Sequence, residues 1–374
     1  MSAAEPEHAP APSRTHRRIG QWVVSLLVAA LLLALVSEWG SIDLWPDPLV
    51  LPHPGLLVAA ILVQIPYALL RAMRLRFVLD SRVAEVAGDP DRKLDRRVLH
   101  GSGLVSFPIV MLLPFRLGEL SRPLLLTRAG EPGIGLAESV SAIAVERVVD
   151  GLLVVGMLFF GLAFADLAGH SEAGEALAYV RGFGRLMALT FVVGLLVLIG
   201  AAARPDLIER SVVWVLPGKL GERAARAALR IAGTIAVLFD WRRGLPFVGT
   251  SLLYWSVTVG QLWLVLHACG LPLGPAEAAA IVAIVGLGIQ LPGGPAQAGS
   301  FQFGMAVALG MLTTADQTSA ASSFAALMYL LQLFGTLALA LPGLLLLARA
   351  RASSRASTTI EPPGPDSRNS PEFG

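Results

Sequence analysis

A long stretch near the end of the chain is almost free of charge. Between Gly244 and Ala348 the only charged residues are Glu277 and Asp316. Soluble domains carry about 25% charged residues, whereas this chain carries 15% and has a mean hydropathy of +0.67. A surface that faces water cannot be built from such a sequence, so we expect an integral membrane protein.

Six segments are long and apolar enough to cross a membrane as helices, which takes about 20 residues each. The positive-inside rule places arginine-rich loops in the cytoplasm, and here it puts both termini there. The segments are Ile19–Val36, Pro48–Leu70, a segment from about Glu146 to Ala165, Leu186–Ala203, and stretches within 244–276 and 317–348.

The fold expected is therefore all-α, a polytopic helix bundle forming one membrane domain over residues 19–350. Residues 1–18 and 351–374 are expected to be disordered and cytoplasmic, because the tail is rich in Ser, Thr and Pro. Its last residues, NSPEFG, are typical of a cloning remnant. The amphipathic stretch Gly221–Trp241 is expected to lie along the inner membrane surface.

Two further apolar segments are broken by glycine and proline. One is His100–Phe115, and the other is the uncharged run between Glu277 and Asp316, which LPGGPAQAGS interrupts. A helical arm of about 14 residues is about 21 Å long, too short for a core of about 30 Å. We expect two re-entrant hairpins that enter from opposite sides, a pattern typical of a transporter's central site. Tilted, glycine-kinked helices that cross fully are the alternative.

Charged residues interrupt the apolar sequence at two places. A charged side chain at the bilayer centre costs about 2.5–3.5 kcal/mol, so these groups must pair, line a wet cavity or lie at the interface. Interfacial anchoring suits long arginines but not short carboxylates, so a polar pocket is favoured over anchoring and over a static ion-pair network. The residues are Arg116, Glu119, Arg122, Glu146, Arg147 and Asp150.

These residues fall into recognisable motifs. The pattern P-x-R-x-G-E-x-x-R begins at Pro114, and E-R-x-x-D begins at Glu146. Together they resemble the transmembrane region of lysylphosphatidylglycerol synthases, a flippase-like integral membrane family. The family's third motif, a Gly/Pro-rich turn followed by G-x-x-E, corresponds to Gly299 through Gln302, with glutamine in place of the usual glutamate.

The resemblance implies a membrane domain that carries polar lipid headgroups across the bilayer, without the aminoacyl-transferase domain of the synthases. The arginines would bind a phosphate, because the guanidinium fork suits it. The carboxylates would balance them and could bind a cationic headgroup substituent or a proton. The substrate-binding residues expected are Arg116, Glu119, Arg122, Ser139, Glu146, Arg147, Asp150 and Gln302. The hinge residues expected are Pro114, Gly118, Pro292, Gly293, Gly294, Pro295 and Gly299.

We therefore expect a lipid flippase or scramblase in the cell membrane, not an enzyme, whose partner is a lipid with an anionic phosphate headgroup. One alternative is an integral-membrane lipid-modifying enzyme, of the polyprenyl-linked sugar transfer type, which a mass change of the lipid would reveal. Another is an accessory subunit of a separate lipid-modifying enzyme. Enzyme activity that appears only when the two proteins are co-expressed would favour it. A homo-oligomer is left open.

Other motifs are absent or isolated. There is no phosphate-binding loop for an ATP motor, and Asp89-Pro90-Asp91 stands in a loop too short for a nucleotide fold. The histidines lack ligand spacing, so no metal or cofactor is expected, and a net charge of +2 without a basic stripe argues against nucleic acid.

Two further sets of residues are expected to have structural roles. Arg71, Arg74 and Arg76 are expected to set topology, and the alternative is that anionic lipid headgroups first gather there. Packing or the aromatic belt is the role favoured over lining the transport path for Tyr254, Trp255, Gln261, Tyr329 and Gln332.

Overall fold

The computed structural model describes residues 14–39, 42–165, 173–204 and 240–359, with scattered positions between 205 and 239. Throughout these residues the regular secondary structure is helical, which confirms the predicted fold class. The α-helices are α1 (Arg14–Trp39), α2 (Pro54–Met73), α3 (Arg76–Ala87), α4 (Arg96–Leu112), α5 (Ser121–Arg128), α6 (Leu136–Phe164), α7 (Ala173–Ala203), α10 (Trp241–Ala268), α11 (Pro275–Gly288), α12 (Ser300–Leu312) and α13 (Thr318–Thr359). The short 3₁₀ helices are η1 (Pro114–Leu120), η3 (Pro295–Gln297) and η4 (Ala315–Gln317).

Six of these helices, α1, α2, α6, α7, α10 and α13, are long and apolar enough to cross a membrane, as predicted. Their boundaries differ from the predicted ones. The second span begins at Pro54, since proline suits the first turn of a helix. The fourth of the six helices begins well before Leu186, at Ala173, and its apolar span is Leu177–Leu196, because exposed arginines within it do not interrupt a helix. The side of the membrane on which each terminus lies stays a prediction.

The two ends of the chain are more helical than expected, where the structure describes them. Helix α1 begins at Arg14, and α13 continues beyond residue 350 to Thr359. The last turns of α13 are rich in Ser and Thr but also contain alanine and arginine, and these two favour helix. Most of Gly221–Trp241 lies outside the described residues.

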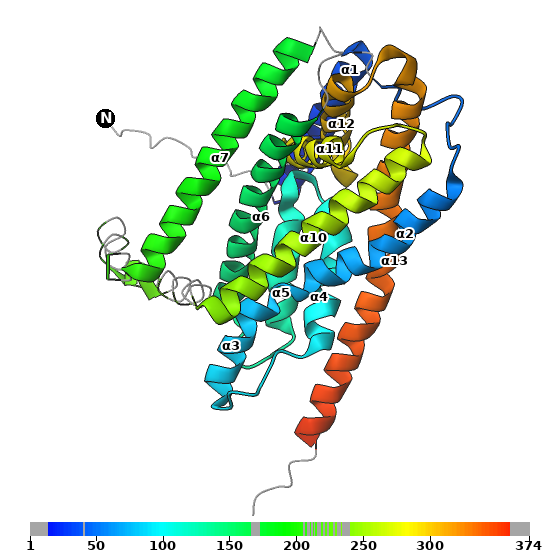
Figure 1. The fold of residues 1–374 in the computed structure, drawn as a ribbon. Helices are drawn as coiled ribbons and strands as arrows, with labels where there is room; N and C mark the ends of the chain where they lie inside the picture. Colours follow the sequence, from blue (N-terminus) through cyan, green and yellow to red (C-terminus); the bar gives the residue numbers. More distant parts are fainter. Residues whose placement is uncertain are drawn as a thin grey trace, which may run out of the picture.

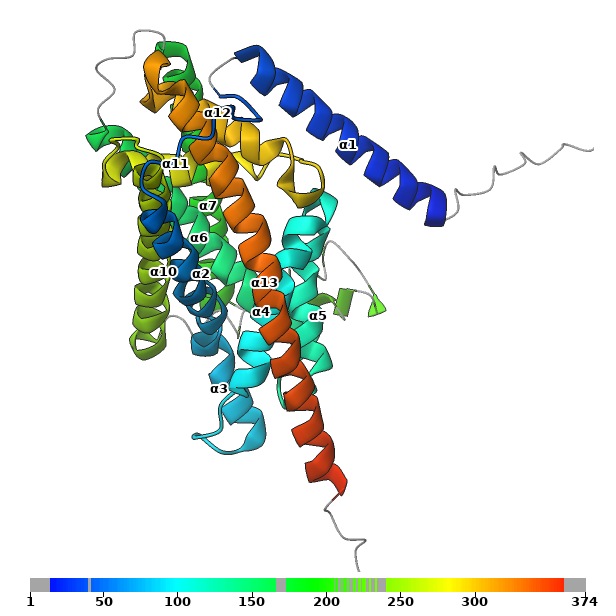
Figure 2. The same cartoon turned by 90° about the vertical axis from the view of Figure 1, so that its right-hand side faces the viewer.

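The bundle is organised by pairs of neighbouring helices. Helix α2 packs against α10, α6 against α11, and α4 against α13, an arrangement that can be followed in Figures 1 and 2. Helix α1 stands apart over much of its length in Figure 2 and contacts α12 and η1. The Ser25 hydroxyl of α1 donates a hydrogen bond of 2.9 Å to the carbonyl of Gly293, in the irregular segment before η3.

Both broken segments form a helix, a break and a second helix. The first pair is α4 and α5 joined by η1, and the second is α11 and α12 joined through η3. The pairs lie toward opposite ends of the bundle in both views (Figures 1 and 2), and η1 contacts η3 where their tips meet. At about 20 Å each, α11 and α12 are too short to cross a core of about 30 Å. Re-entrance from opposite sides stays a prediction.

The expected hinge residues lie at these two breaks. Pro114 and Pro295 begin the 3₁₀ helices, and Pro292 through Gly294 lie in the irregular segment before η3. Gly299 has a φ of 83° and lies against the backbone of Ala29 in α1. Gly118 lies so close to α4 that a Cβ would overlap the backbone of that helix. Glycine is therefore required at both turns.

We expect Gly118→Ala to destabilise the protein by about 1–3 kcal/mol, the usual range for inserting a group into a filled space. The new methyl group would meet the backbone of Ile109 and Val110, which cannot turn aside as a side chain can. The measurement is the thermal unfolding midpoint of the purified protein in detergent.

The matched control is Gly156→Ala on α6, where nothing lies within 4 Å of the added Cβ. This variant should unfold at or above the midpoint of the parent, because alanine favours helix by about 1 kcal/mol over glycine. Equal midpoints for the two variants would show that the first break is not tightly packed.

Candidate functional site

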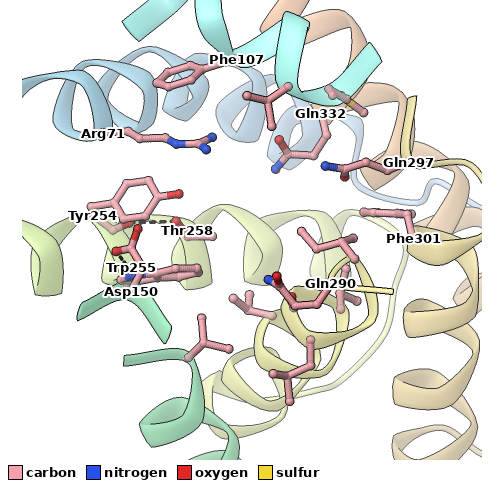
Figure 3. Close-up of a pocket in the computed structure, with 18 of the residues that line it drawn as sticks. Arg71, Phe107, Asp150, Tyr254, Trp255, Thr258, Gln290, Gln297, Phe301 and Gln332 are labelled. Atoms are coloured by element: carbon pink, nitrogen blue, oxygen red, sulfur yellow. Dashed lines mark hydrogen bonds between the residues drawn. The ribbon is translucent and has the colours of Figure 1, made fainter. Parts of the chain in front are cut away.

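A cavity of about 410 Å³ lies between the two broken helix pairs, with walls from α2, α4, α6, α10, α11 and α13. Its polar lining is divided between two regions. The charged side chains, Arg71, Glu119, Arg147 and Asp150, come from α2, η1 and α6, and three amides, Gln290, Gln297 and Gln332, come from the second broken pair and α13. Figure 3 shows Arg71 and Asp150 toward one end of the cavity and the amides toward the other.

Behind the charged end lies a buried ion-pair network centred on Arg74. This arginine stands between α2 and α3 with its side chain fully buried, and it binds the carboxylates of both Glu146 and Asp150. It also donates to the Ser251 hydroxyl at 3.2 Å, and its guanidinium lies 4.5 Å from the centre of the Tyr254 ring. The network therefore joins the α2–α3 junction, α6 and α10.

Arg122 extends the network to α5. It donates to the second oxygen of Glu146 at 3.2 Å and to the carbonyl oxygen of Ala72 at 2.7 Å, and only 6% of the residue is exposed. The indole nitrogen of Trp255 donates to Asp150 at 3.0 Å. Buried charges are tolerated where each has an opposite charge and further hydrogen bonds, and these contacts provide both.

Two arginines face the cavity itself. Arg147 lies 3.5 Å from Glu119, with 36% and 30% of the two side chains exposed. The guanidinium of Arg71 stacks over the Phe107 ring at 4.2 Å and donates a long hydrogen bond of 3.5 Å to the Tyr67 hydroxyl. No carboxylate of the described chain forms an ion pair with Arg71. Among the side chains that the structure describes here, four arginines thus face three carboxylates, and Arg71 carries the surplus positive charge into the cavity (Figure 3).

Some of the predicted site residues line the cavity, and others lie buried behind it. Glu119, Arg147 and Asp150 line the cavity, as the predicted pocket requires. Arg122 and Glu146 lie behind it and bind each other, in the manner of the static network that was the alternative. The charged cluster is therefore divided between the cavity lining and a buried ion-pair network, and the substrate-binding role of these residues stays a prediction.

The remaining predicted residues lie outside the cavity lining. Ser139 on α6 is fully buried, and its hydroxyl has no hydrogen-bond partner among the described residues. Gln302 caps α12, its side-chain oxygen accepting from the Gly299 amide at 2.9 Å. A glutamate could make the same cap, so the substitution from the family motif preserves this local role. The side chains of Pro114 and Arg116 lie outside the described residues.

Sequence reasoning left the two arginines that organise the site, Arg71 and Arg74, out of the predicted site residues, because it favoured topology over lipid-headgroup binding for both. A signal was present in their spacing. Tyr67, Arg71 and Arg74 recur at helical intervals of four and three, so they project from one face of the chain. Tyr254, Trp255 and Gln332, for which packing or belt roles were favoured over lining the path, also line the cavity.

Arg74→Met should destabilise the protein by about 3–5 kcal/mol, the range observed when one partner of a buried ion pair is removed. Methionine fills part of the space but leaves Asp150 with its Trp255 bond alone and removes one of the two arginines on Glu146. The measurement is again the unfolding midpoint in detergent.

Arg76→Ala is the control two residues away. Arg76 pairs with Asp80 at 3.6 Å on the surface, with 31% of its side chain exposed, and such pairs contribute less than about 1 kcal/mol. If the Arg76 and Arg74 variants lost the same stability, the network would not be a stabilising centre.

The six apolar helices, together with charged residues held between them, define a multi-pass membrane protein. The family model of the lysylphosphatidylglycerol synthase transmembrane region matches residues 22–343, so the chain belongs to that family. The predicted resemblance is thereby confirmed, and the family indicates a membrane protein connected with lipids. No curated protein and no solved structure gives a significant match.

Proposed function

We propose that this protein is a flippase or scramblase of the cell membrane that moves the headgroup of a phosphorylated lipid through the central cavity. The observation that carries the proposal is Arg71, a cavity-lining arginine with no ion pair in the described chain. A phosphodiester supplies the single negative charge that would balance it. The planar guanidinium also matches phosphate oxygens in geometry.

The charged end of the cavity is suited to binding a phosphate group transiently. Arg147 is held by Glu119 at 3.5 Å, longer than a normal charged hydrogen bond, so its guanidinium can turn to a second phosphate oxygen without first breaking a tight pair. The carboxylate of Asp150 is already bound by Arg74 and Trp255. Positive charge therefore remains available in the cavity while the negative charge is engaged.

The acyl chains have a separate path on the outside of the bundle. An apolar groove of about 540 Å³ runs between α2 and α13, lined by residues such as Leu62 and Phe334. The same two helices present Arg71 and Gln332 to the cavity. A lipid lying at this seam would place its headgroup inside and its chains outside, which avoids moving charge through hydrocarbon.

The two broken helix pairs supply the barrier in this proposal. Their tips meet at η1 and η3, between one end of the bundle and the other. Separation of the tips on either side would open the cavity to that side. The chain carries no phosphate-binding loop, and we propose transport down a gradient or coupled to an ion rather than to ATP.

We expect Arg71→Met to reduce transport at least tenfold while leaving the fold intact. A hydrogen bond to a charged group contributes about 1.5–3 kcal/mol, and about 1.4 kcal/mol corresponds to a factor of ten. The measurement is the rate at which reconstituted protein exposes fluorescent phospholipid to a membrane-impermeant quencher.

Arg128→Met, an exposed arginine on α5 with the same change of charge, is the control and should transport at the parent rate. Unchanged transport by the Arg71 variant would reject the assigned site. If lipid incubated with the protein and cytosolic donors changed in mass, the protein would instead be a lipid-modifying enzyme.

A further inference from the structure

The half of the cavity away from Arg71 has a chemistry of its own. Its polar side chains are Gln290, Gln297 and Gln332, with Thr336 on α13, and none of the described residues that line it there is charged. All the charged lining residues come from α2, η1 and α6. A headgroup that binds its phosphate at Arg71 would therefore extend toward neutral amides.

Two of these amides are available to a ligand. The side-chain amides of Gln297 and Gln332 make no hydrogen bond with other described residues, although both line the cavity. Figure 3 shows both side chains directed into the cavity, from η3 and α13 respectively. An amide both donates and accepts hydrogen bonds, so the pair offers both kinds of partner at one place.

The backbone at Gln297 is held in an unusual conformation. Ala296 and Gln297 have φ values of 58° and 59°, a left-handed region that residues other than glycine rarely adopt. The Tyr329 hydroxyl donates to the Ala296 carbonyl at 3.1 Å, and the Gly294 amide donates to the Ala298 carbonyl at 2.9 Å. Strain of this kind persists where the surroundings impose it, commonly at ligand sites.

From these observations we infer that the amide end binds an uncharged, hydroxylated headgroup, such as glycerol, inositol or a sugar linked through the lipid phosphate. Hydroxyl groups match the donors and acceptors of the two amides. The inference rests on the proposed function and adds the substrate class to it.

A cationic headgroup fits this end poorly. The amide oxygens at this end can accept hydrogen bonds from an ammonium group, but they do not neutralise its charge when it leaves water, and the cavity carboxylates lie at the other end. Both are already engaged, Glu119 by Arg147 and Asp150 by Arg74. Aminoacylated and ethanolamine lipids are therefore expected to be disfavoured.

The test uses vesicles with the reconstituted protein and acyl-labelled phosphatidylglycerol or phosphatidylethanolamine. The parent should move phosphatidylglycerol faster than phosphatidylethanolamine. Gln332→Leu should slow phosphatidylglycerol about fivefold, the effect of losing one ordinary hydrogen bond, and leave phosphatidylethanolamine unchanged. Gln332→Glu should instead favour phosphatidylethanolamine, because it places a carboxylate at this end.

The control is Gln21→Leu, which removes an exposed glutamine of α1 and should keep the parent's rates and preference. Faster movement of phosphatidylethanolamine by the parent, or an unchanged preference in Gln332→Leu, would overturn the inference.

A second readout separates this inference from the proposed function. Thermal unfolding of purified protein in detergent is measured with each lipid added, which reports binding alone. If the parent transports neither lipid but is stabilised by phosphatidylglycerol, and Gln332→Leu loses that stabilisation, the transport proposal fails and the amide site stands. If stabilisation is equal for both lipids and both proteins, the amide site is rejected.

Discussion

A buried arginine bound by two carboxylates is the interaction on which the rest of this structure depends. Arg74 has no exposed side-chain surface, and its contacts with Glu146 and Asp150 join helices that are distant in sequence. In a medium of low dielectric constant, an unpaired charge would cost several kcal/mol. The helices that carry these groups must therefore come together, and their register follows from the pairing.

The network also determines what the cavity presents to a ligand. Arg74 and Arg122 engage Glu146 and Asp150 from behind, and Arg71 is left without an ion pair among the described residues. The second broken helix pair contributes only neutral side chains to the lining. A cavity with a positive end and an amide end favours one orientation of a phosphorylated, hydroxylated headgroup, which is how the proposed function and the proposed substrate class are connected.

Much of the fold could be predicted because the bilayer restricts it so strongly. A helix must be about 20 residues long to cross, so the six spans and the two broken segments follow from hydropathy and from the positions of glycine and proline. Boundaries were less predictable. Arginines such as Arg181 in α7 lie on an exposed face, and hydropathy alone stops a span at such residues although the helix continues.

The sequence by itself determined that the chain is a helical membrane protein, where its helices are interrupted, and that charged residues must be sheltered, because each of these follows from the cost of exposing polar groups to hydrocarbon. Only the tertiary structure decided which charges neutralise one another. Arg122 and Arg147 lie in similar motifs, yet Arg122 is buried behind the cavity and Arg147 faces it. Pairing depends on distances between helices remote in sequence, and a local pattern carries no information about those distances.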